Sequence, residues 1–396
     1  VSAAFGDDDR PTAVGVLAAA VAVALPLGPV LGGFLLEHFS WSSVFWVNVP
    51  AVCLALATGA VLMPESRNPA APPLDIAGAV LSTGSVVCLV WGFNEGPERG
   101  WGAAPAWGLL AGSAVLLGAF VWRQRRTLHP LIDPALFRDR RFSWGTAATV
   151  AVSVALFATL FVFPQYLQSV VGDDPMAAGL RLLPMMGGLL VAGGLAGPLG
   201  RALGTKLCVA SGLALLVGGL ATLSQVHLTT GYAYVAAGLA LCGLGTGLAI
   251  AAAMNAVMAA VGGDEAGTGA SLNSALRQVG GAVAVAVLGG VLSSAYARHL
   301  RPALGALPAI DAKMARASVA EAVQVAKRLP AGGSLLRTAV GAAFLHGMSI
   351  VMLVCAGIAV AGLFTSLCYL PRHAALAAAA PPRPPAEAPE LTGTRR

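Results

Sequence analysis

The side chains that could do chemistry are a few polar residues inside long apolar runs. Arg277 and Gln278 lie inside the apolar run 271–296, and Asn273 precedes Arg277 by four residues. Because residues four apart share one face of a helix, Asn273 and Arg277 would project together. Polar side chains in such a run are costly and are often functional. Two hypotheses stay open: a cluster that lines or gates a cavity, or a conformational lock in which Arg277 extends toward a polar interface.

A second group of polar residues could contact an organic solute. Gln165 and Gln168 follow Pro164 in a stretch rich in aromatic residues, and Asn255 lies beside Met254 in a later apolar run. Aromatic rings offer contact area and amides offer adjustable hydrogen bonds, so such a surface would suit amphipathic organic molecules. The alternative is that the amides only bond neighbouring helices while the rings form an interfacial belt.

Glycines and two prolines gather toward the end of the apolar run 12–36. Gly28 and Gly32 stand four apart, a spacing that lets two helices approach backbone to backbone. Gly15 and Gly33 extend the pattern. Pro29 removes an amide donor, so the helix should bend there. These residues predict a bent span with a glycine face.

Residue types for catalysis or metal binding do not form recognisable patterns. The six cysteines are scattered without a CxxC pair, and we interpret them as small core residues. The sequence contains no nucleophile elbow, phosphate-binding loop or metal-ligand spacing. Glu37 and Asp75 fall at the ends of apolar runs, and His346 could titrate near neutral pH or be interfacial. We expect no enzyme, no cofactor, no metal and no nucleic-acid partner.

The composition places these residues in a membrane. The chain has 396 residues, of which 57% are hydrophobic and 11% charged, and its mean hydropathy is +0.77. Soluble domains carry about 25% charged residues, so a soluble fold of this length would lack the polar surface to cover itself. The apolar runs do not alternate as barrel strands do, and each could cross about 30 Å of hydrocarbon. We predict an all-α polytopic membrane protein with the lipid bilayer as its partner.

Ten spans can be counted, and basic residues in the short loops set their direction. The predicted spans are 12–36, 43–63, 75–94, 103–122, 142–168, 177–200, 207–226, 231–260, 271–296 and 338–370. The positive charge of the loop 123–141 places that loop in the cytoplasm and the long loop 298–337 outside. Helical spacing in 314–329 predicts a surface helix on the protein or the membrane interface, with a binding lid as the alternative. The tail 371–396, rich in proline and alanine, is expected to be disordered.

Several stretches resemble one family of transporters. The glycine and proline spacing near the first predicted span resembles the antiporter motif in the fifth span of drug:proton antiporters of the major facilitator superfamily; the matching residues are Gly15, Ala24, Gly28, Pro29, Gly32 and Gly33. The stretch 267–281, which contains Asn273, Arg277 and Gln278, is similar to the opening of the thirteenth span in the 14-span branch. Further similar stretches lie at 41–50, 130–142, 178–184 and 343–347.

The resemblance implies a domain organisation. The ten spans would be spans five to fourteen of a major-facilitator-type fold, so the first four spans would be missing and the protein N-terminally incomplete. The chain would then comprise the end of an N-terminal helix bundle (1–63), two linker spans (64–122), the basic cytoplasmic loop (123–141), a C-terminal six-helix bundle with its extracellular loop (142–370), and the tail.

The resemblance also implies a function. We expect proton-coupled efflux of drugs or other amphipathic organic solutes by alternating access, with the glycine stretch as a seal and hinge and the coupling carboxylate in the missing spans. The partners would be a small-molecule substrate and protons, and the protein a monomer in the plasma membrane. Two alternatives remain: an inactive truncated remnant or membrane interaction partner, and an exporter of a single metabolite or self-made antibiotic.

Overall fold

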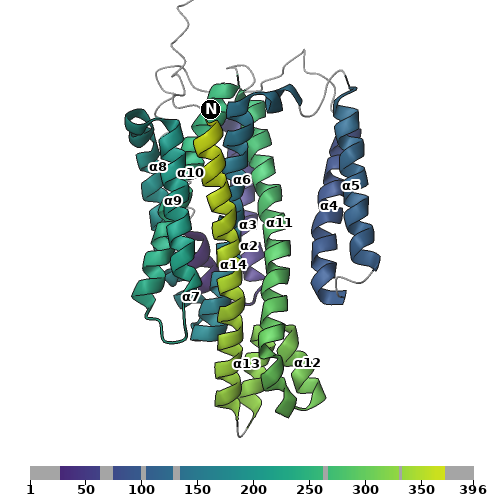
Figure 1. Cartoon of the computed structure of the whole chain (residues 1–396), viewed down its shortest axis with the longest axis vertical. Coiled ribbons are helices and arrows are strands. Elements are labelled where there is room, and N and C mark those ends of the chain that lie inside the picture. Colours follow the sequence, from purple (N-terminus) through teal and green to yellow (C-terminus); the bar gives the residue numbers. More distant parts are fainter. Residues whose placement is uncertain are drawn as a thin grey trace, which may run out of the picture.

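The protein is a set of long helices that run side by side (Figure 1). A computed structural model describes residues 27–62, 75–99, 104–127, 134–261, 266–329 and 332–370. Within these ranges, nine helical segments are long and apolar enough to cross a membrane, and they confirm nine of the ten predicted spans. The first predicted span, 12–36, lies largely outside the described residues. Its described part belongs to a helix that covers residues 27–38.

The described elements beyond helix 27–38 follow one another along the chain. Their bounds are α2 (Ser43–Trp46), α3 (Asn48–Leu62), α4 (Ile76–Arg99), α5 (Ala104–Gln124), η1 (Pro134–Arg138), α6 (Arg140–Gln165), the π-helix η2 (Tyr166–Val171), α7 (Pro175–Arg181), α8 (Leu183–Leu203), α9 (Thr205–Ser224), α10 (Tyr232–Ala260), α11 (Ala266–Leu300), η4 (Arg301–Ala306), α12 (Ala309–Ala317), α13 (Val319–Arg328) and α14 (Gly333–Tyr369).

The core of the molecule surrounds α10, which packs against α6, α8 and α9. Glycines allow this close approach: a Cβ on Gly243 would strike the carbonyl of Met185, and one on Gly219 would lie 2.7 Å from the amide nitrogen of Cys242. Lipid tails are as apolar as the helices, so helix association in a membrane depends on close van der Waals packing between small residues. Cys242 also behaves as a small core residue, because it is fully buried and unoxidised.

Other cysteines differ from the expectation of core packing. Cys208 and Cys355 are buried like Cys242, whereas Cys53 and Cys368 are exposed on the surfaces of α3 and α14. Those two helices present outer faces to the surroundings, where a small apolar thiol needs no packing partner. The prediction of core cysteines is therefore right for the central bundle and wrong for Cys53 and Cys368.

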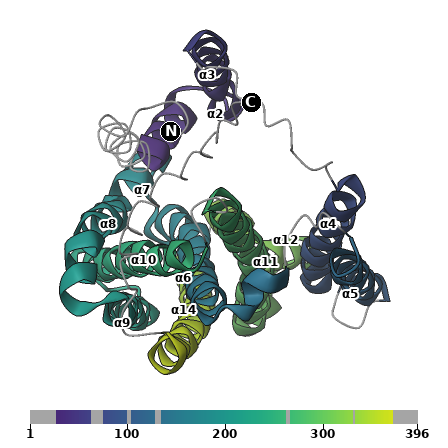
Figure 2. The same ribbon diagram turned by 90° about the horizontal axis from the view of Figure 1, so that it is seen from above.

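The hairpin of α4 and α5 stands beside the main bundle and reaches it through α11 (Figure 2). Two buried serines join its helices: Ser113 Oγ donates to the Ser85 carbonyl at 2.9 Å, and Ser85 Oγ donates to the Ser113 carbonyl at 3.1 Å. Reciprocal hydroxyl bonds of this kind stabilise helix pairs in lipid. The helix α3 stands apart from both the main bundle and the hairpin (Figure 2), and no residue of its span segment is buried.

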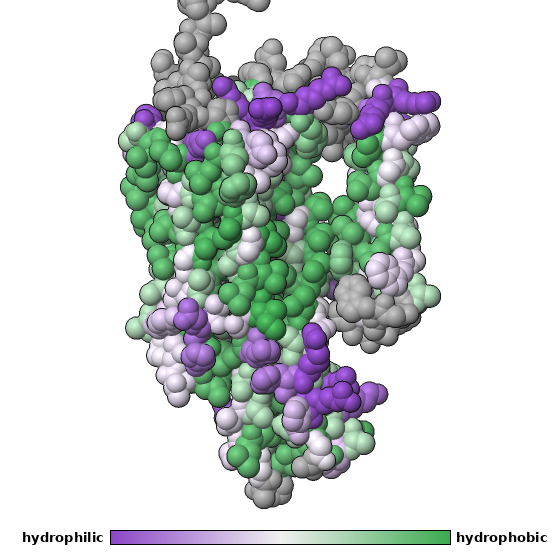
Figure 3. All heavy atoms as spheres, in the orientation of Figure 1, coloured by the Kyte–Doolittle hydropathy of each residue, from purple (hydrophilic) through white to green (hydrophobic). Residues whose placement is uncertain are grey.

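Polar side chains mark the two ends of the molecule and apolar ones cover its flank (Figure 3). One end, called here the basic end, carries basic residues at the C-terminus of α5, the N-terminus of α6 and the junction of α8 with α9; they are Arg123, Arg125, Arg126, Arg140, Arg141, Arg201 and Lys206. The opposite end, called here the α7 end, carries α7, α12 and α13 (Figure 1). An apolar belt between two polar ends is the surface of a multi-pass membrane protein.

The long loop near the end of the chain is more ordered than the sequence predicts. Helix α11 continues to Leu300, and α14 begins at Gly333. Between them lie the 3₁₀ helix η4 and the two α-helices α12 and α13. The predicted single helix over 314–329 is broken at Ser318, whose extended backbone and side-chain hydroxyl cap α13 by accepting from the Glu321 amide at 3.1 Å. One face of α13 is buried, including Ala322 and Val325, so this helix packs on the protein.

Candidate functional site

Asn273 is the centre of a buried polar cluster that joins three helices. It is fully buried on α11, and its Oδ1 accepts a hydrogen bond of 2.7 Å from the Thr149 hydroxyl of α6. Its Nδ2 lies 3.3 Å from the Met254 sulfur of α10. A polar group held in this way cannot leave its partner without exposing an unpaired amide to an apolar interior. The cluster therefore fixes α6, α10 and α11 relative to one another.

Arg277 lies one turn further along α11 and faces the same neighbour. Its Nε donates to the Ser153 hydroxyl of α6 at 3.2 Å, and Ser153 in turn donates to the Thr149 carbonyl at 2.8 Å. The predicted shared face of Asn273 and Arg277 is confirmed by these contacts. Gln278 and Asn255 are exposed, so the structure does not bring them into this cluster.

A cavity of about 150 Å³ opens at the α7 end, between α6, α11, α14 and the α12–α13 turn. Its wall includes three aromatic rings and several polar side chains: Phe161, Gln165, Ser293, Tyr296, Ser318 and Phe344. Gln165 donates from Nε2 to the Phe161 carbonyl at 2.9 Å. Gln168 belongs to the π-helix η2, is exposed, and does not line this cavity. The structure thus separates the two glutamines that the sequence placed together.

Helix 27–38 meets α7 backbone to backbone at the same end. A Cβ on Gly33 would lie 2.6 Å from the Pro175 carbonyl oxygen and 2.8 Å from the Met176 Cα. A Cβ on Gly179 would lie 2.5 Å from the Pro29 carbonyl oxygen. Neither position can hold a side chain unless the helices move apart, so the two glycines define the contact.

The glycines that form this contact are not the pair predicted from spacing. Among the described residues, no atom lies within 4 Å of the position that a Cβ on Gly28 or Gly32 would occupy. The partner α7 approaches the helix face that carries Pro29 and Gly33, which is rotated from the face of Gly28 and Gly32. The two remaining residues of the motif, Gly15 and Ala24, lie outside the described residues.

A charged and aromatic cluster, called here the α7 clamp, holds the other side of α7; its members are Asp173, Arg181 and Tyr232. The Arg181 guanidinium lies 2.9 Å from the Asp173 carboxylate and 5.1 Å from the centre of the Tyr232 ring. The Tyr232 hydroxyl donates to the Arg181 carbonyl at 3.1 Å. Burial raises the pKa of Asp173, and the Arg181 charge acts against that rise.

The sequence contains a local signal for the start of α7 that the predicted spans do not include. Asp174 followed by Pro175 is the pattern of a helix N-cap and first turn, and Asp174 Oδ1 accepts from the Ala177 amide at 2.6 Å. The preceding Gly172 ends η2 with φ of 92°, a conformation that favours glycine. The clamp itself joins residues of different helices, which no local pattern reveals.

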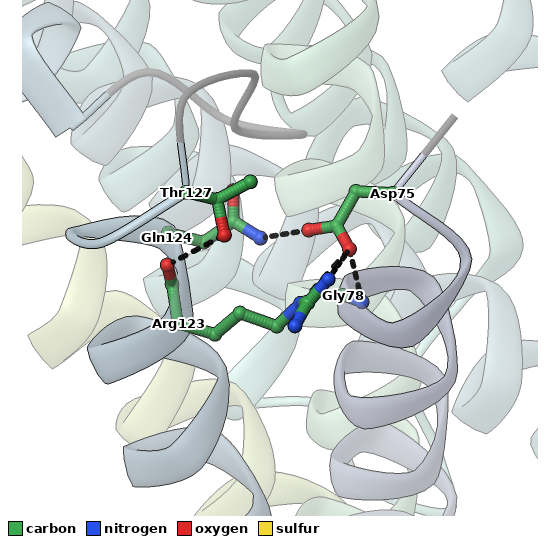
Figure 4. A network of polar contacts seen from close by, with 5 residues as sticks. All are labelled: Asp75, Gly78, Arg123, Gln124 and Thr127. Atoms are coloured by element: carbon green, nitrogen blue, oxygen red, sulfur yellow. Dashed lines mark hydrogen bonds and ion pairs between the residues drawn. The ribbon is translucent and has the colours of Figure 1, made fainter. Parts of the chain in front are cut away.

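A second charged network closes the α4–α5 hairpin at the basic end (Figure 4). Asp75 Oδ1 accepts from Arg123 Nε at 2.9 Å and from the Gly78 amide at 2.9 Å, while Oδ2 accepts from Gln124 Nε2 at 3.0 Å. The hydrogen bond from Arg123 is the largest cause that holds the pKa of Asp75 below its usual value, and the Gly78 amide adds to it. Sequence reasoning noticed Asp75 only as the end of a span.

Other titratable residues gather without forming a metal site. The His346 ring of α14 stacks on the His299 ring at the end of α11, with 4.6 Å between the ring centres. Within the ranges that the structure describes, no group of three or more histidine, cysteine, aspartate or glutamate residues could hold a metal ion.

Comparison with known proteins agrees with the motifs and the helices. A model of the Major Facilitator Superfamily matches residues 1–285. The chain is similar to the multidrug resistance protein Stp of Mycobacterium tuberculosis, with 34% identity over 306 residues, which is 77% of this chain and 57% of Stp. It is also similar to the tetracenomycin C resistance and export protein of Streptomyces glaucescens, with 30% identity over 357 residues, which is 88% of this chain and 66% of that protein.

A third relative shows the same relation of lengths. The methyl viologen resistance protein SmvA of Salmonella typhimurium is 32% identical over 324 residues, which is 81% of this chain and 65% of SmvA. The chain therefore spans 57 to 66% of the length of these three relatives. Because the family model covers most of the sequence and the described residues form apolar membrane-crossing helices, the chain belongs to the Major Facilitator Superfamily.

Proposed function

We propose that the chain works in the export of amphipathic organic compounds by alternating access, in exchange for protons. The observation that carries this proposal is the glycine-lined contact between helix 27–38 and α7. Alternating access needs two groups of helices that close tightly at one end and can part there. A contact made by backbone atoms seals against solutes, yet it has no interlocked side chains that would have to unpack before the helices separate.

The direction of export follows from the charges. The basic end carries arginine and lysine in short connections, which favours the cytoplasmic side of a plasma membrane. The α7 end then faces outward, and the contact at Gly33 and Gly179 closes the outer side. In this orientation helix 27–38 and α7 are in contact on the outer side, and the 150 Å³ cavity opens on that same side.

The 150 Å³ cavity would hold part of an organic substrate, because pockets for whole ligands usually measure about 300–1,000 Å³. Its wall combines the rings of Phe161 and Phe344 with the amide of Gln165 and the hydroxyl of Ser293. Such a wall provides apolar contact area with a few hydrogen-bonding groups and suits molecules that are partly aromatic and partly polar. The relatives whose names mention multidrug, tetracenomycin C and methyl viologen resistance support compounds of this kind as substrates.

Asn273 and Arg277 fit the role of a lock better than that of a binding surface. Their side chains bond to Thr149 and Ser153 of α6, and neither of them lines the cavity. We assign them to holding α6 and α11 together as one rigid group of helices during the cycle. Exposed Gln278, Gln168 and Asn255 then belong to the outer surfaces of their helices.

One observation favours a second candidate, a membrane interaction partner. The span segment of α3 has no buried residue, so an apolar helix surface is open to another protein. Purification of the chain in mild detergent with its molar mass measured by light scattering tests this candidate. A stoichiometric protein partner in the absence of any transport activity would favour it over export.

Dye accumulation in cells tests the export proposal. We expect cells that express the chain to accumulate less of a cationic aromatic dye than cells with an empty vector, and the difference to vanish after a protonophore is added. Gly33→Ala should abolish the difference, and Gly32→Ala, whose Cβ meets no described atom within 4 Å, should retain it. Equal accumulation with and without the chain, at confirmed membrane expression, would contradict the proposal.

A further inference from the structure

The short helix α7 takes part in two contacts at once. Helix 27–38 presses against Pro175, Met176 and Gly179, and the α7 clamp attaches Arg181 to the loop before the helix and to the start of α10. With seven residues, α7 is far too short to be stable alone, so its position depends on both contacts. A change on one side of α7 is therefore transmitted to the other.

Asp173 lies in the loop just before α7, and its surroundings disfavour the charged form of its carboxyl group. Its side chain is only 10% exposed, and the Arg181 side chain that pairs with it is 35% exposed. The buried Oδ2 has this ion pair but no well-aligned hydrogen bond among the described residues. The next residue, Asp174, adds a second carboxylate. A poorly hydrated carboxylate beside another acid binds a proton more readily than a free aspartate does.

Several charged and titratable groups surround Asp173 from the elements packed around it. Arg181 and Asp174 act on its charge directly, and its own charge acts on Tyr166 and Tyr232. From α14, an Arg337 guanidinium nitrogen lies 3.1 Å from the position that a Cβ on Gly172 would occupy. Burial is the largest influence on Asp173 and raises its pKa above the ordinary 3.8, while Arg181 lowers it.

We propose that Asp173 binds a proton in linkage with the contact between helix 27–38 and α7, so that the proton favours the closed contact. The proposal rests on the proposed function and names a group at which external protons regulate the outer contact. When helix 27–38 leaves Pro175, water reaches the loop that contains Asp173, and the carboxylate becomes an ordinary solvated acid. Because linkage is reciprocal, the state that binds the proton more tightly is the state that the proton stabilises.

The sign of this linkage suits control of the outer contact by external protons. In this proposal Asp173 acts at the outer end only and does not itself carry a proton across the membrane. A proton that arrives from the outer solution would bind Asp173, stabilise closure of the outer end and return the protein to its inward-facing state. Loss of the proton would restore the charge of Asp173 and favour separation of helix 27–38 from α7. A substrate bound from the inside could then leave through the opened outer end.

Distance measurements between two spin labels test this proposal without requiring transport. The labels are placed on Leu36→Cys and Leu180→Cys, because these side chains are 45% and 44% exposed on the two contacting helices. The exposed Cys53 and Cys368 and the half-buried Cys88 are replaced by serine. The purified full chain in lipid nanodiscs is measured from pH 4 to pH 8 by double electron–electron resonance.

We expect the short-distance population to grow as the pH falls, with a closed-to-open ratio that changes by at most about tenfold per pH unit, the limit for one proton. In Asp173→Asn the population should not depend on pH. In Arg181→Gln the midpoint should move to higher pH, because the cation that opposes protonation is gone. The control Asp311→Asn, which changes an acid on α12 at the same end, should behave like the parent.

Two results would overturn the proposal: an unchanged pH dependence in Asp173→Asn, or a short-distance population that shrinks on acidification of the parent. If Asp173→Asn does not fold, the direction of the Arg181→Gln shift decides alone. A pH-dependent distance in a chain that fails to move dye would reject the export function and retain this linkage. Dye export with a pH-independent distance would reject the linkage only.

Discussion

Replacing Gly33 with alanine should open the contact between helix 27–38 and α7. The new Cβ would lie 2.6 Å from the Pro175 carbonyl oxygen and 2.8 Å from the Met176 Cα. Both are backbone atoms, so no side chain can rotate away to make room. The helices would have to part by about 0.8 Å, from 2.6 Å to an ordinary contact of 3.4 Å.

The size of this effect follows from overpacking in a tight interface. Such insertions cost about 1–3 kcal/mol, which corresponds to a change of about fivefold to more than a hundredfold in the closed-to-open ratio. The neighbouring Gly32 provides a matched control. No described atom lies within 4 Å of its Cβ position, and alanine is the better helix former, so Gly32→Ala should leave the contact intact.

The spin-label pair on helix 27–38 and α7 measures this prediction directly. We expect the parent and Gly32→Ala to share one short distance, and Gly33→Ala to lose most of it. Gly179→Ala should have the same effect from the other side of the contact, because its Cβ would lie 2.5 Å from the Pro29 carbonyl oxygen. An unchanged distance distribution in both Gly33→Ala and Gly179→Ala would refute the backbone contact as the seal.

Three further predictions concern the polar contacts. Thr149→Val leaves the buried Asn273 amide without its hydroxyl partner. In thermal unfolding this variant should be less stable than the parent by about 1–3 kcal/mol. The control Gln278→Ala changes an exposed side chain and should alter the stability by less than about 0.5 kcal/mol. Asp75→Asn should lower the Tm at pH 7. This difference should begin to shrink near pH 3.8, the ordinary pKa that the carboxyl regains on unfolding, and should vanish once the pH falls below the lowered pKa of the native carboxyl. A difference that stays constant on acidification would contradict the network. Ser318→Ala removes the cap of α13, worth about 1 kcal/mol, and should speed proteolysis between α12 and α13, with an unchanged cleavage rate as the contrary result.

The membrane spans were predictable because length and apolar composition suffice to identify them. A run of about 20 apolar residues fits the hydrocarbon thickness whatever its neighbours are. The same reasoning underestimated α11 and α14, which extend past the expected ends because polar residues near their termini, such as Arg298 and Arg337, still continue the helix. The helices α12 and α13 lie between these extensions. The segment that the sequence predicted only as a surface helix in a long loop is therefore packed on the protein.

The candidate site was harder to predict because its contacts depend on which helix faces which. Glycine spacing pointed to Gly28 and Gly32, but the approach of α7 selected Gly33, and no sequence pattern specifies that direction. Thr149 and Asn273 are 124 positions apart, so only the hydrogen bond between them identifies Thr149 as a partner. The shared face of Asn273 and Arg277 was predictable, because one helical turn fixes it without reference to any other helix.

Exchange of a dye for protons in liposomes tests the central claim most directly. The purified chain is reconstituted into liposomes with an acidic interior, and a cationic aromatic dye is supplied outside in a neutral buffer. The account predicts dye uptake above that of protein-free liposomes, abolished by a protonophore and by Gly33→Ala but retained in Gly32→Ala. Uptake equal to that of protein-free liposomes, or equal uptake by Gly33→Ala and the parent, would contradict it.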